Sequence, residues 1–291
     1  MGLINIFCSS REKKTILTEI NLIKTVSMKT VRPKKNLGQH FLTDLNIARR
    51  IADTVDACPS VPVLEVGPGM GVLTQYLMQK PRKLKVVELD KESVSYLEEN
   101  YPALKDNIIY GDFLQMDLSK VFEGEQFVLT GNYPYDISSQ IFFKMLDNRE
   151  LIPCCTGMIQ REVAERITSA PGNKAYGILS VLIQAWYDTE YLFTVDENVF
   201  NPPPKVKSAV IRLTRNSVTD LGCDEKLFKR VVKTVFNQRR KMLRVSVKQI
   251  FAGQEMPDSN FFNTDVMTKR PEQLSVSQFV ELTNTIAGYL K

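Results

Sequence analysis

The sequence predicts an α/β fold, in which helices cover both faces of a parallel sheet and a smaller all-helical region follows. Two observations predict it. Short apolar runs alternate with segments of helical spacing up to about residue 215, and no convincing strand occurs after residue 224. Such alternation is typical of sheets built from strand–helix–strand units.

The expected elements follow one another in a regular order. Asp44 is a candidate N-cap for a helix that carries Ala48 and Ile51 on one face. Strands are expected at 63–66, 84–90, 107–110, 127–130 and 157–160, with further β-like runs at 187–195 and 206–213. Helices are expected after residue 71, at 91–100, 161–169 and 175–185, and from 224 onward. Residues 200–205 contain three consecutive prolines and are expected to be stiff and extended.

The domain boundary is expected near Arg215, between a catalytic domain (28–215) and a helical C-terminal domain (216–291). Residues 1–27 have no apolar core of signal-peptide length, and their two glutamates argue against an acid-poor transit peptide. The basic, motif-bearing sequence begins at Met28. We therefore expect that Met28 is the working start, or that 1–27 form a loosely ordered extension.

Composition narrows the class of protein. The net charge of +5 is mild, so the location of the charges matters more than their sum. The five cysteines are odd in number and form no CxxC pair, which argues against a disulfide framework or a zinc site and favours a reducing, cytoplasmic environment. No apolar run approaches the ~20 residues that span a bilayer, so no membrane partner is expected. No metal site is predicted.

A glycine-rich stretch joins the strand at 63–66 to the next helix: Glu65-Val66-Gly67-Pro68-Gly69-Met70-Gly71. Glu88 and Asp112 end the next two expected strands. In open α/β sheets ligands bind at the carboxyl ends of strands, where glycines admit a nucleotide and a carboxylate can accept from ribose hydroxyls. Glycine turns and acidic caps are also common structural features, but three such sites on successive strands favour a nucleoside pocket. No lysine follows the glycines in Walker fashion, which disfavours a nucleotide triphosphatase.

Residues 131–139 read GNYPYDISS and follow the strand at 127–130. A turn needs only glycine, asparagine or proline, so two tyrosines around Pro134 exceed what a turn requires. Together with the glycine loop, Glu88 and Asp112, this stretch resembles adenine-N6 methyltransferases that use S-adenosylmethionine. NLGQHFL at 36–42 and FNPPPKVKS at 200–208 narrow the resemblance to the small-subunit ribosomal RNA adenine dimethyltransferase family, from about Arg32 to the C-terminus.

The resemblance implies a Rossmann-like methyltransferase domain and a set of site residues. The catalytic residues would be Asn132, Pro134 and Tyr135. The donor contacts would be His40, Leu42, Gly67, Glu88, Asp112 and Asn132. Tyr135 and Phe200 would stack on the target base, although Phe200 could equally be a core residue beside a proline turn. The family commonly has leucine at position 133 and asparagine at position 40, so Tyr133 could reshape the pocket wall and His40 could alter the donor contact.

Basic side chains flank the predicted pocket. The candidate RNA contacts are Lys34, Lys35, Lys226, Lys229, Arg230, Lys233, Arg239, Arg240, Lys241 and Arg244. A single charge run is usually a solvated face, but two clusters beside a base pocket favour phosphate contacts.

The implied reaction is dimethylation of two neighbouring adenines near the 3′ end of small-subunit ribosomal RNA. The implied enzyme is a monomer that acts on a late assembly intermediate of the subunit. Two alternatives stay open: an Erm-type methyltransferase of the large-subunit RNA, and a non-catalytic assembly or transcription factor on the same fold.

Overall fold

The structure is a computed structural model that describes residues 31–34 and 38–290. The chain divides into two compact units, Met1–Arg32 and Pro33–Lys291. Only Val31 and Arg32 of the first unit are described, so all helices and strands below belong to the second. The expectation for residues 1–27 and the predicted RNA contact Lys35 lie outside the described residues.

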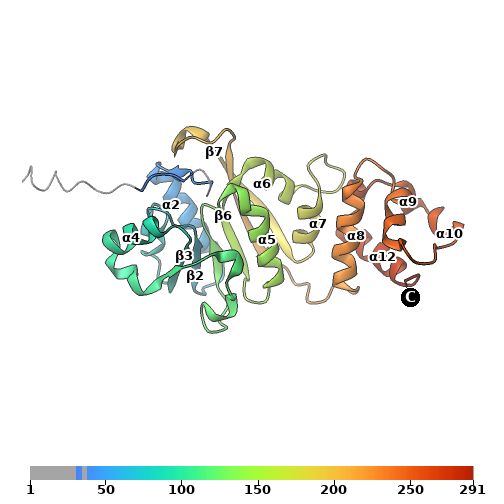
Figure 1. The fold of residues 1–291 in the computed structure, drawn as a ribbon, viewed down its shortest axis with the longest axis horizontal. Coiled ribbons are helices and arrows are strands. Elements are labelled where there is room, and N and C mark those ends of the chain that lie inside the picture. Colours follow the sequence, from blue (N-terminus) through green and yellow to red (C-terminus); the bar gives the residue numbers. More distant parts are fainter. Residues whose placement is uncertain (1–30, 35–37, 291) are drawn as a thin grey trace, which may run out of the picture. The chain divides into compact units, whose positions relative to one another are not determined.

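A seven-stranded sheet forms the centre of the second unit (Figure 1). In spatial order its strands are β4 (Ile108–Tyr110), β3 (Leu84–Glu88), β2 (Val63–Val66), β5 (Val128–Thr130), β6 (Cys154–Gln160), β9 (Ser208–Arg215) and β7 (Tyr187–Val195). The first five strands are parallel, whereas β9 is antiparallel to both β6 and β7. The prediction of a parallel sheet is therefore wrong for one strand, β9, because β7 runs in the same direction as the first five. No crossover helix joins β7 to β9, and neighbouring strands joined without a crossover run antiparallel.

Helices cover both faces of the sheet, as predicted. Alternate residues of each strand enter two separate cores: Val63 and Val128 pack on one face, Leu64 and Leu129 on the other. The first face is covered by α2 (Leu45–Asp53), α3 (Thr74–Leu77) and α4 (Lys91–Asn100), and the second by α5 (Ser138–Asp147), α6 (Arg161–Thr168) and α7 (Ile178–Gln184). Asp44 caps α2 as predicted, because its side chain accepts from the backbone N–H groups of Asn46 and Ile47.

The C-terminal region is helical, as predicted. It contains α8 (Glu225–Asn237), α9 (Leu243–Ser246), α10 (Ser259–Phe262), α11 (Asp265–Thr268) and α12 (Val276–Ala287). Helix α8 packs against α7, and α9, α10 and α12 lie beyond α8 (Figure 1). The apolar face of α8 enters the same core as α5, α6 and α7. Residues 33–291 thus form one compact unit, and the functional division near residue 215 stays a prediction.

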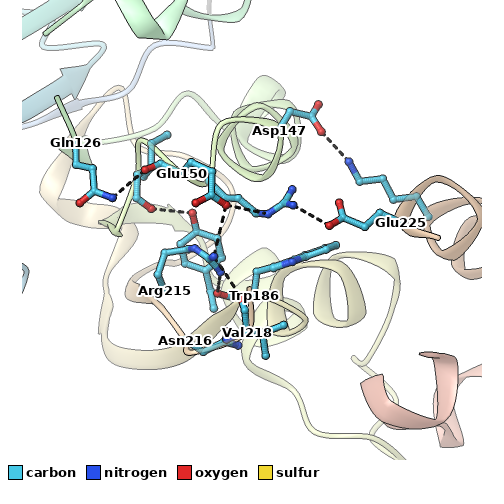
Figure 2. A network of polar contacts seen from close by, with 12 residues as sticks. Gln126, Asp147, Glu150, Trp186, Arg215, Asn216, Val218 and Glu225 are labelled. Atoms are coloured by element: carbon cyan, nitrogen blue, oxygen red, sulfur yellow. Dashed lines mark hydrogen bonds and ion pairs between the residues drawn. The ribbon is translucent and has the colours of Figure 1, made fainter. Parts of the chain in front are cut away.

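A polar network bridges the expected boundary (Figure 2). The Arg215 guanidinium donates to the main-chain oxygens of Trp186 (2.7 Å) and Val218 (3.2 Å). Arg149, just after α5, donates to Glu225 at the start of α8 (2.8 Å). These bonds join the linker and α8 to the sheet-bearing region.

A second, two-stranded sheet joins distant parts of the chain. In it β1 (Phe41–Leu42) pairs antiparallel with β8 (Phe200–Asn201), so that Leu42 lies opposite Phe200. The prediction of an extended segment at 200–205 is consistent with β8 and with the absence of helix there. This pairing brings the segment before α2 to the segment before β9.

The structure contains one disulfide among its described residues, between Cys58 and Cys154. This single bond is not the framework that the cysteine pattern argued against, but the sequence analysis did not predict it. Residue spacing cannot reveal this pair, because Cys58 follows the turn after α2 and Cys154 begins β6, and only the fold brings them together. No helix in the described part of the chain is long and apolar enough to cross a membrane.

Candidate active site

A cavity opens at the carboxyl ends of β2, β3, β4 and β5. The strand order reverses between β2 and β5, and ligands bind at such switch points in open α/β sheets. Eight of the predicted site residues line this one cavity: His40, Leu42, Gly67, Glu88, Asp112, Asn132, Pro134 and Tyr135.

The glycine loop forms one wall of the cavity. Gly69 has a φ of +55°, a region that favours glycine, and a Cβ added there would lie 3.0 Å from the Phe41 ring. Its N–H donates to Glu88 Oε2 (3.0 Å). A Cβ added at Gly67 would face the Pro134 ring at 3.8 Å. The missing side chain therefore keeps space open between the loop and the Asn-Tyr-Pro-Tyr corner (132–135).

Glu88 is held in place by main-chain donors. Besides the bond from Gly69, its Oε1 accepts from the N–H of Asp90 (2.8 Å). The side chain is buried, and burial raises the pKa of this carboxyl although both N–H bonds oppose the change. Asp112 accepts from the N–H of Leu114 (2.9 Å) where it starts a short 3₁₀ turn. Both carboxyl groups are thus oriented by local backbone.

Glu65 is a cavity residue to which the sequence analysis gave no role. It is 1% exposed, and its Oε2 accepts from the Thr74 hydroxyl (2.7 Å). Burial raises the pKa of Glu65 to about 8, with a further contribution from the charge of Glu88. Glu65 is therefore a neutral acid at pH 7. Its position beside the glycine loop indicated that Glu65 could belong to the site. The sequence alone does not show that its side chain is buried, and the raised pKa depends on that burial.

The Asn132 amide has a defined orientation. Its Nδ2 donates to the main-chain oxygen of His40 (3.2 Å), and only the nitrogen of the amide can face a carbonyl. Oδ1 therefore points the other way and has no hydrogen-bond donor among the described residues. Backbone bonds hold the corner to β6: Tyr133 N donates to Met158 O (3.0 Å), and Met158 N donates to Gly131 O (2.9 Å).

Tyr133 also holds the corner at 132–135 against β6. Its ring is buried and packs edge-on against Phe142, and its hydroxyl donates to the main-chain oxygen of Thr156 (3.0 Å). A Cβ at Gly157 would lie 2.7 Å from the Tyr133 ring, so the ring uses space that glycine leaves in β6. The larger side chain thus fixes the corner to β6 as well as lining the cavity.

Tyr135 is bounded by two groups from distant segments. Its ring stacks on the His40 imidazole, with centroids 5.5 Å apart and planes 29° apart. Its hydroxyl shares a hydrogen bond with the buried Ser208 at the start of β9. The His40 Nδ1 lies 2.8 Å from the main-chain oxygen of Pro202.

Phe200 is not brought to the cavity. It is 4% exposed, belongs to the core that also contains Leu42, and is absent from the cavity lining. This geometry fits the alternative reading of a core phenylalanine and gives no support to base stacking, which stays a prediction.

Several predicted RNA contacts already have partners within the protein. Lys34 pairs with Asp90 (2.5 Å) and Glu92 (3.1 Å), and Lys229 pairs with Asp147 (2.7 Å; Figure 2). Arg230 donates to Ile250 O (2.8 Å), and the Lys233 ammonium lies 5.2 Å from the centre of the Phe143 ring. Arg239 donates to the main-chain oxygen of Lys174 and lies near Glu272.

Four others are exposed and have no partner among the described residues: Lys226, Arg240, Lys241 and Arg244. Arg240 and Lys241 lie between α8 and α9, and Arg244 lies in α9; we call these three residues the α8–α9 basic cluster. The predicted RNA contacts therefore fall into two groups. Some already bond within the protein, and the others are exposed and have no partner among the described residues. No cluster of His, Cys, Asp or Glu suited to a metal ion occurs in the described segments.

Comparison with known proteins decides the family. The family model described as ribosomal RNA adenine dimethylase matches residues 30–287. The chain belongs to the ribosomal RNA adenine dimethylase family. Membership confirms the predicted resemblance, the enzyme class and S-adenosylmethionine as cofactor.

Curated relatives of this dimethylase family match most of the chain. Ribosomal RNA small subunit methyltransferase A of Phocaeicola vulgatus is 68% identical over 265 residues, which cover 91% of this chain and 93% of that protein. The protein of the same name from Porphyromonas gingivalis is 60% identical over 258 residues, covering 88% and 98%.

Two solved structures share the fold. A dimethyladenosine transferase from Plasmodium falciparum superposes with a TM-score of 0.72 at 24% identity, covering 86% of this chain and 98% of that chain. The 23S rRNA methyltransferase ErmE gives a TM-score of 0.61 at 27% identity, covering 84% and 99%. The Rossmann-like methyltransferase fold predicted from the resemblance is thereby confirmed.

Proposed function

We propose that the chain transfers methyl groups from S-adenosylmethionine to the N6 atoms of two adjacent adenines near the 3′ end of small-subunit ribosomal RNA. The proposal rests on the orientation of the Asn132 amide. Its Nδ2 is bonded to the main-chain oxygen of His40, so Oδ1 stays available in the cavity. The same cavity is lined by Pro134, Tyr135, Glu88 and Asp112. Family membership and the 68% identical small-subunit relative support the RNA class.

The cavity fits the methyl donor. Glu88 would accept from the ribose hydroxyls and Asp112 from the adenine amino group, while Gly67 leaves the space between loop and corner that a side chain would fill. Leu42, Asn132 and the main chain of His40 complete the proposed contacts. When bound, S-adenosylmethionine supplies a methyl group that is already activated on a sulfonium.

The corner at 132–135 would prepare the target amine. The amine is a poor nucleophile because its lone pair is delocalised into the ring. Asn132 Oδ1 can accept one amine hydrogen, and Pro134 O can accept the other. Among the described residues Pro134 O receives one long bond, from Ile137 N (3.3 Å), and a carbonyl oxygen has a second lone pair for the amine. These bonds draw electron density toward N6 and align it with the methyl group.

Stacking on Tyr135 would hold the base outside its helix. Base–aromatic stacking contributes about 1–3 kcal/mol, which offsets part of the cost of unstacking. No general base is required, because the amine attacks as a neutral group and its proton leaves afterwards to water. Neither Asn132 nor the neutral acid Glu65 needs to remove that proton before transfer.

The α8–α9 basic cluster and Lys226 are exposed and have no partner among the described residues, so they would contact RNA phosphates. Binding there would depend on the charge of the RNA backbone and on RNA shape. We further propose that the enzyme acts as a monomer, in the cytoplasm, on a late assembly intermediate of the small subunit. The paired cations Lys34, Lys229 and Arg239 would serve mainly to hold the fold.

The test is methyl transfer by the full chain to purified small and large ribosomal subunits that lack the modification, followed by mass spectrometry of nuclease-digested RNA. We expect two adjacent dimethyladenosines in small-subunit RNA only. Transfer to the large subunit alone would favour the Erm-type alternative. Donor binding without transfer to either subunit would favour a non-catalytic factor.

A further inference from the structure

We propose that the His40 imidazole is a positioning group for Tyr135, and that it braces the ring on which the target adenine stacks. This inference rests on the proposed function and deepens it. It assigns the side chain of His40 to the base side of the cavity, whereas the resemblance assigns this residue to the methyl donor.

The first support is the contact between the two rings. Their centroids lie 5.5 Å apart and their planes are inclined by 29°, within the range of offset-stacked aromatic pairs. Both side chains line the cavity. One face of Tyr135 is therefore covered by His40, and the base is assigned to the other face.

The second support is that the imidazole is itself held from outside the donor site. Nδ1 lies 2.8 Å from the main-chain oxygen of Pro202. A carbonyl oxygen can only accept, so Nδ1 carries the proton and donates. The pairing of β1 with β8 fixes the backbones that carry both residues. The orientation of the ring is thus set by the segment 200–202.

The third support is the restraint on the other end of Tyr135. Its hydroxyl bonds to Ser208, which is fully buried at the start of β9. The Tyr135 ring is thus fixed at its tip by Ser208 and on one face by His40. Phe200, the other candidate aromatic, is buried in the core, so His40 is the ring that the structure brings to Tyr135.

The main chain of His40 has a separate task, because its carbonyl accepts from the Asn132 amide. Substitutions at position 40 remove the imidazole and leave this carbonyl in place. Asparagine, common at this position in the family, can still donate to Pro202 O but cannot stack. Phenylalanine can stack but cannot donate.

The experiment compares His40→Ala, His40→Asn and His40→Phe in the full chain. The readouts are the KM for unmodified small subunits, kcat, the donor Kd by calorimetry, and the fluorescence of 2-aminopurine placed at the target adenine of an RNA fragment. We expect Ala and Asn to raise the RNA KM about three- to tenfold and to reduce 2-aminopurine quenching, with the donor Kd within about twofold of wild type. Phe should restore most of the quenching.

Two results would overturn the inference. A donor Kd weakened about tenfold with an unchanged RNA KM would make the imidazole a donor contact. Tighter RNA binding by His40→Ala would mean that the ring occupies the position of the base. Melting temperatures of the variants show whether they fold. If the proposed function itself were wrong, the wild-type chain would already give neither transfer nor quenching, which separates the two failures.

Discussion

The Asn132 side chain donates a hydrogen bond to the main-chain oxygen of His40 (3.2 Å), although 92 residues separate them in sequence. This bond sets which end of the amide faces the cavity interior. The strand that ends before Gly131 supplies the amide, and the segment before α2 supplies the carbonyl. An acceptor for an amine hydrogen is thus oriented before any substrate arrives, so the target amine meets a group that need not reorganise.

Replacing Asn132 tests this orientation. We expect Asn132→Ala to lower the rate of methyl transfer about 100-fold or more, as for removal of an oriented polar group at a reaction centre, while donor binding persists. Asn132→Asp should also fail, because a carboxylate cannot donate to His40 O and is repelled by it. Single-turnover transfer and donor calorimetry measure both effects. Transfer by Asn132→Ala at the wild-type rate would remove this residue from its role.

The buried Glu65 should make the free energy of unfolding of the protein depend on pH. Its folded pKa of about 8 lies above the ordinary value of 4.5, so the folded state holds the proton more tightly than the unfolded state. The resulting stabilisation is complete below about pH 4.5 and is lost as pH rises through 8. At about 1.4 kcal/mol per tenfold change in proton affinity, the rise in pKa from 4.5 to about 8 amounts to roughly 5 kcal/mol.

Urea unfolding at several pH values between 5 and 9 measures the effect of Glu65. Glu65→Gln, which mimics the neutral acid, should flatten the decline, whereas the exposed control Glu99→Gln should retain it. An unchanged pH profile in Glu65→Gln would show that another group is responsible.

The α8–α9 basic cluster predicts a salt-dependent loss of RNA binding. Reversing Arg240, Arg244 and Lys241 to glutamate should weaken binding to the small subunit and reduce the slope of log K against log salt by about 2–3, while donor affinity is retained. The matched control reverses three exposed lysines at other sites, Lys83, Lys105 and Lys120, and so changes the net charge equally. An equal loss in the control would mean that only net charge matters.

Substitutions of Phe200 test whether its ring serves the hydrophobic core or stacks on the target base. Because the ring is 4% exposed, Phe200→Ala should lower the free energy of unfolding by about 3–5 kcal/mol. Phe200→Leu should cost less than about 1.5 kcal/mol and leave the RNA KM unchanged. A large rise in the KM of Phe200→Leu without a loss of stability would instead support stacking on the base.

Local sequence signals predicted the elements that local physics decides. Asp44 caps α2, the apolar run at 63–66 forms β2, and Glu88 ends its strand beside the glycine loop. The placement of the glycine loop, Glu88 and Asp112 at the ends of successive strands also predicted that they would line one cavity. Each of these features depends on neighbours within a few residues or on the general rule for strand ends.

Tertiary contacts account for what the sequence did not predict. Lys34 looked like a phosphate contact, but the fold places Asp90 beside it with its side chain almost fully buried. Phe200 lies in a core because β8 pairs with β1, which no local pattern encodes. The pKa of Glu65 depends on burial, and the Cys58–Cys154 bond depends on the approach of two segments far apart in the chain.

The most direct measurement is a crystal structure of the full chain with S-adenosylhomocysteine, the product of the methyl donor. The account predicts that its ribose hydroxyls contact Glu88, and that its sulfur faces the space beside Asn132 Oδ1 and the Pro134 carbonyl. A product bound away from the corner at 132–135, or with its sulfur turned from Asn132, would contradict it.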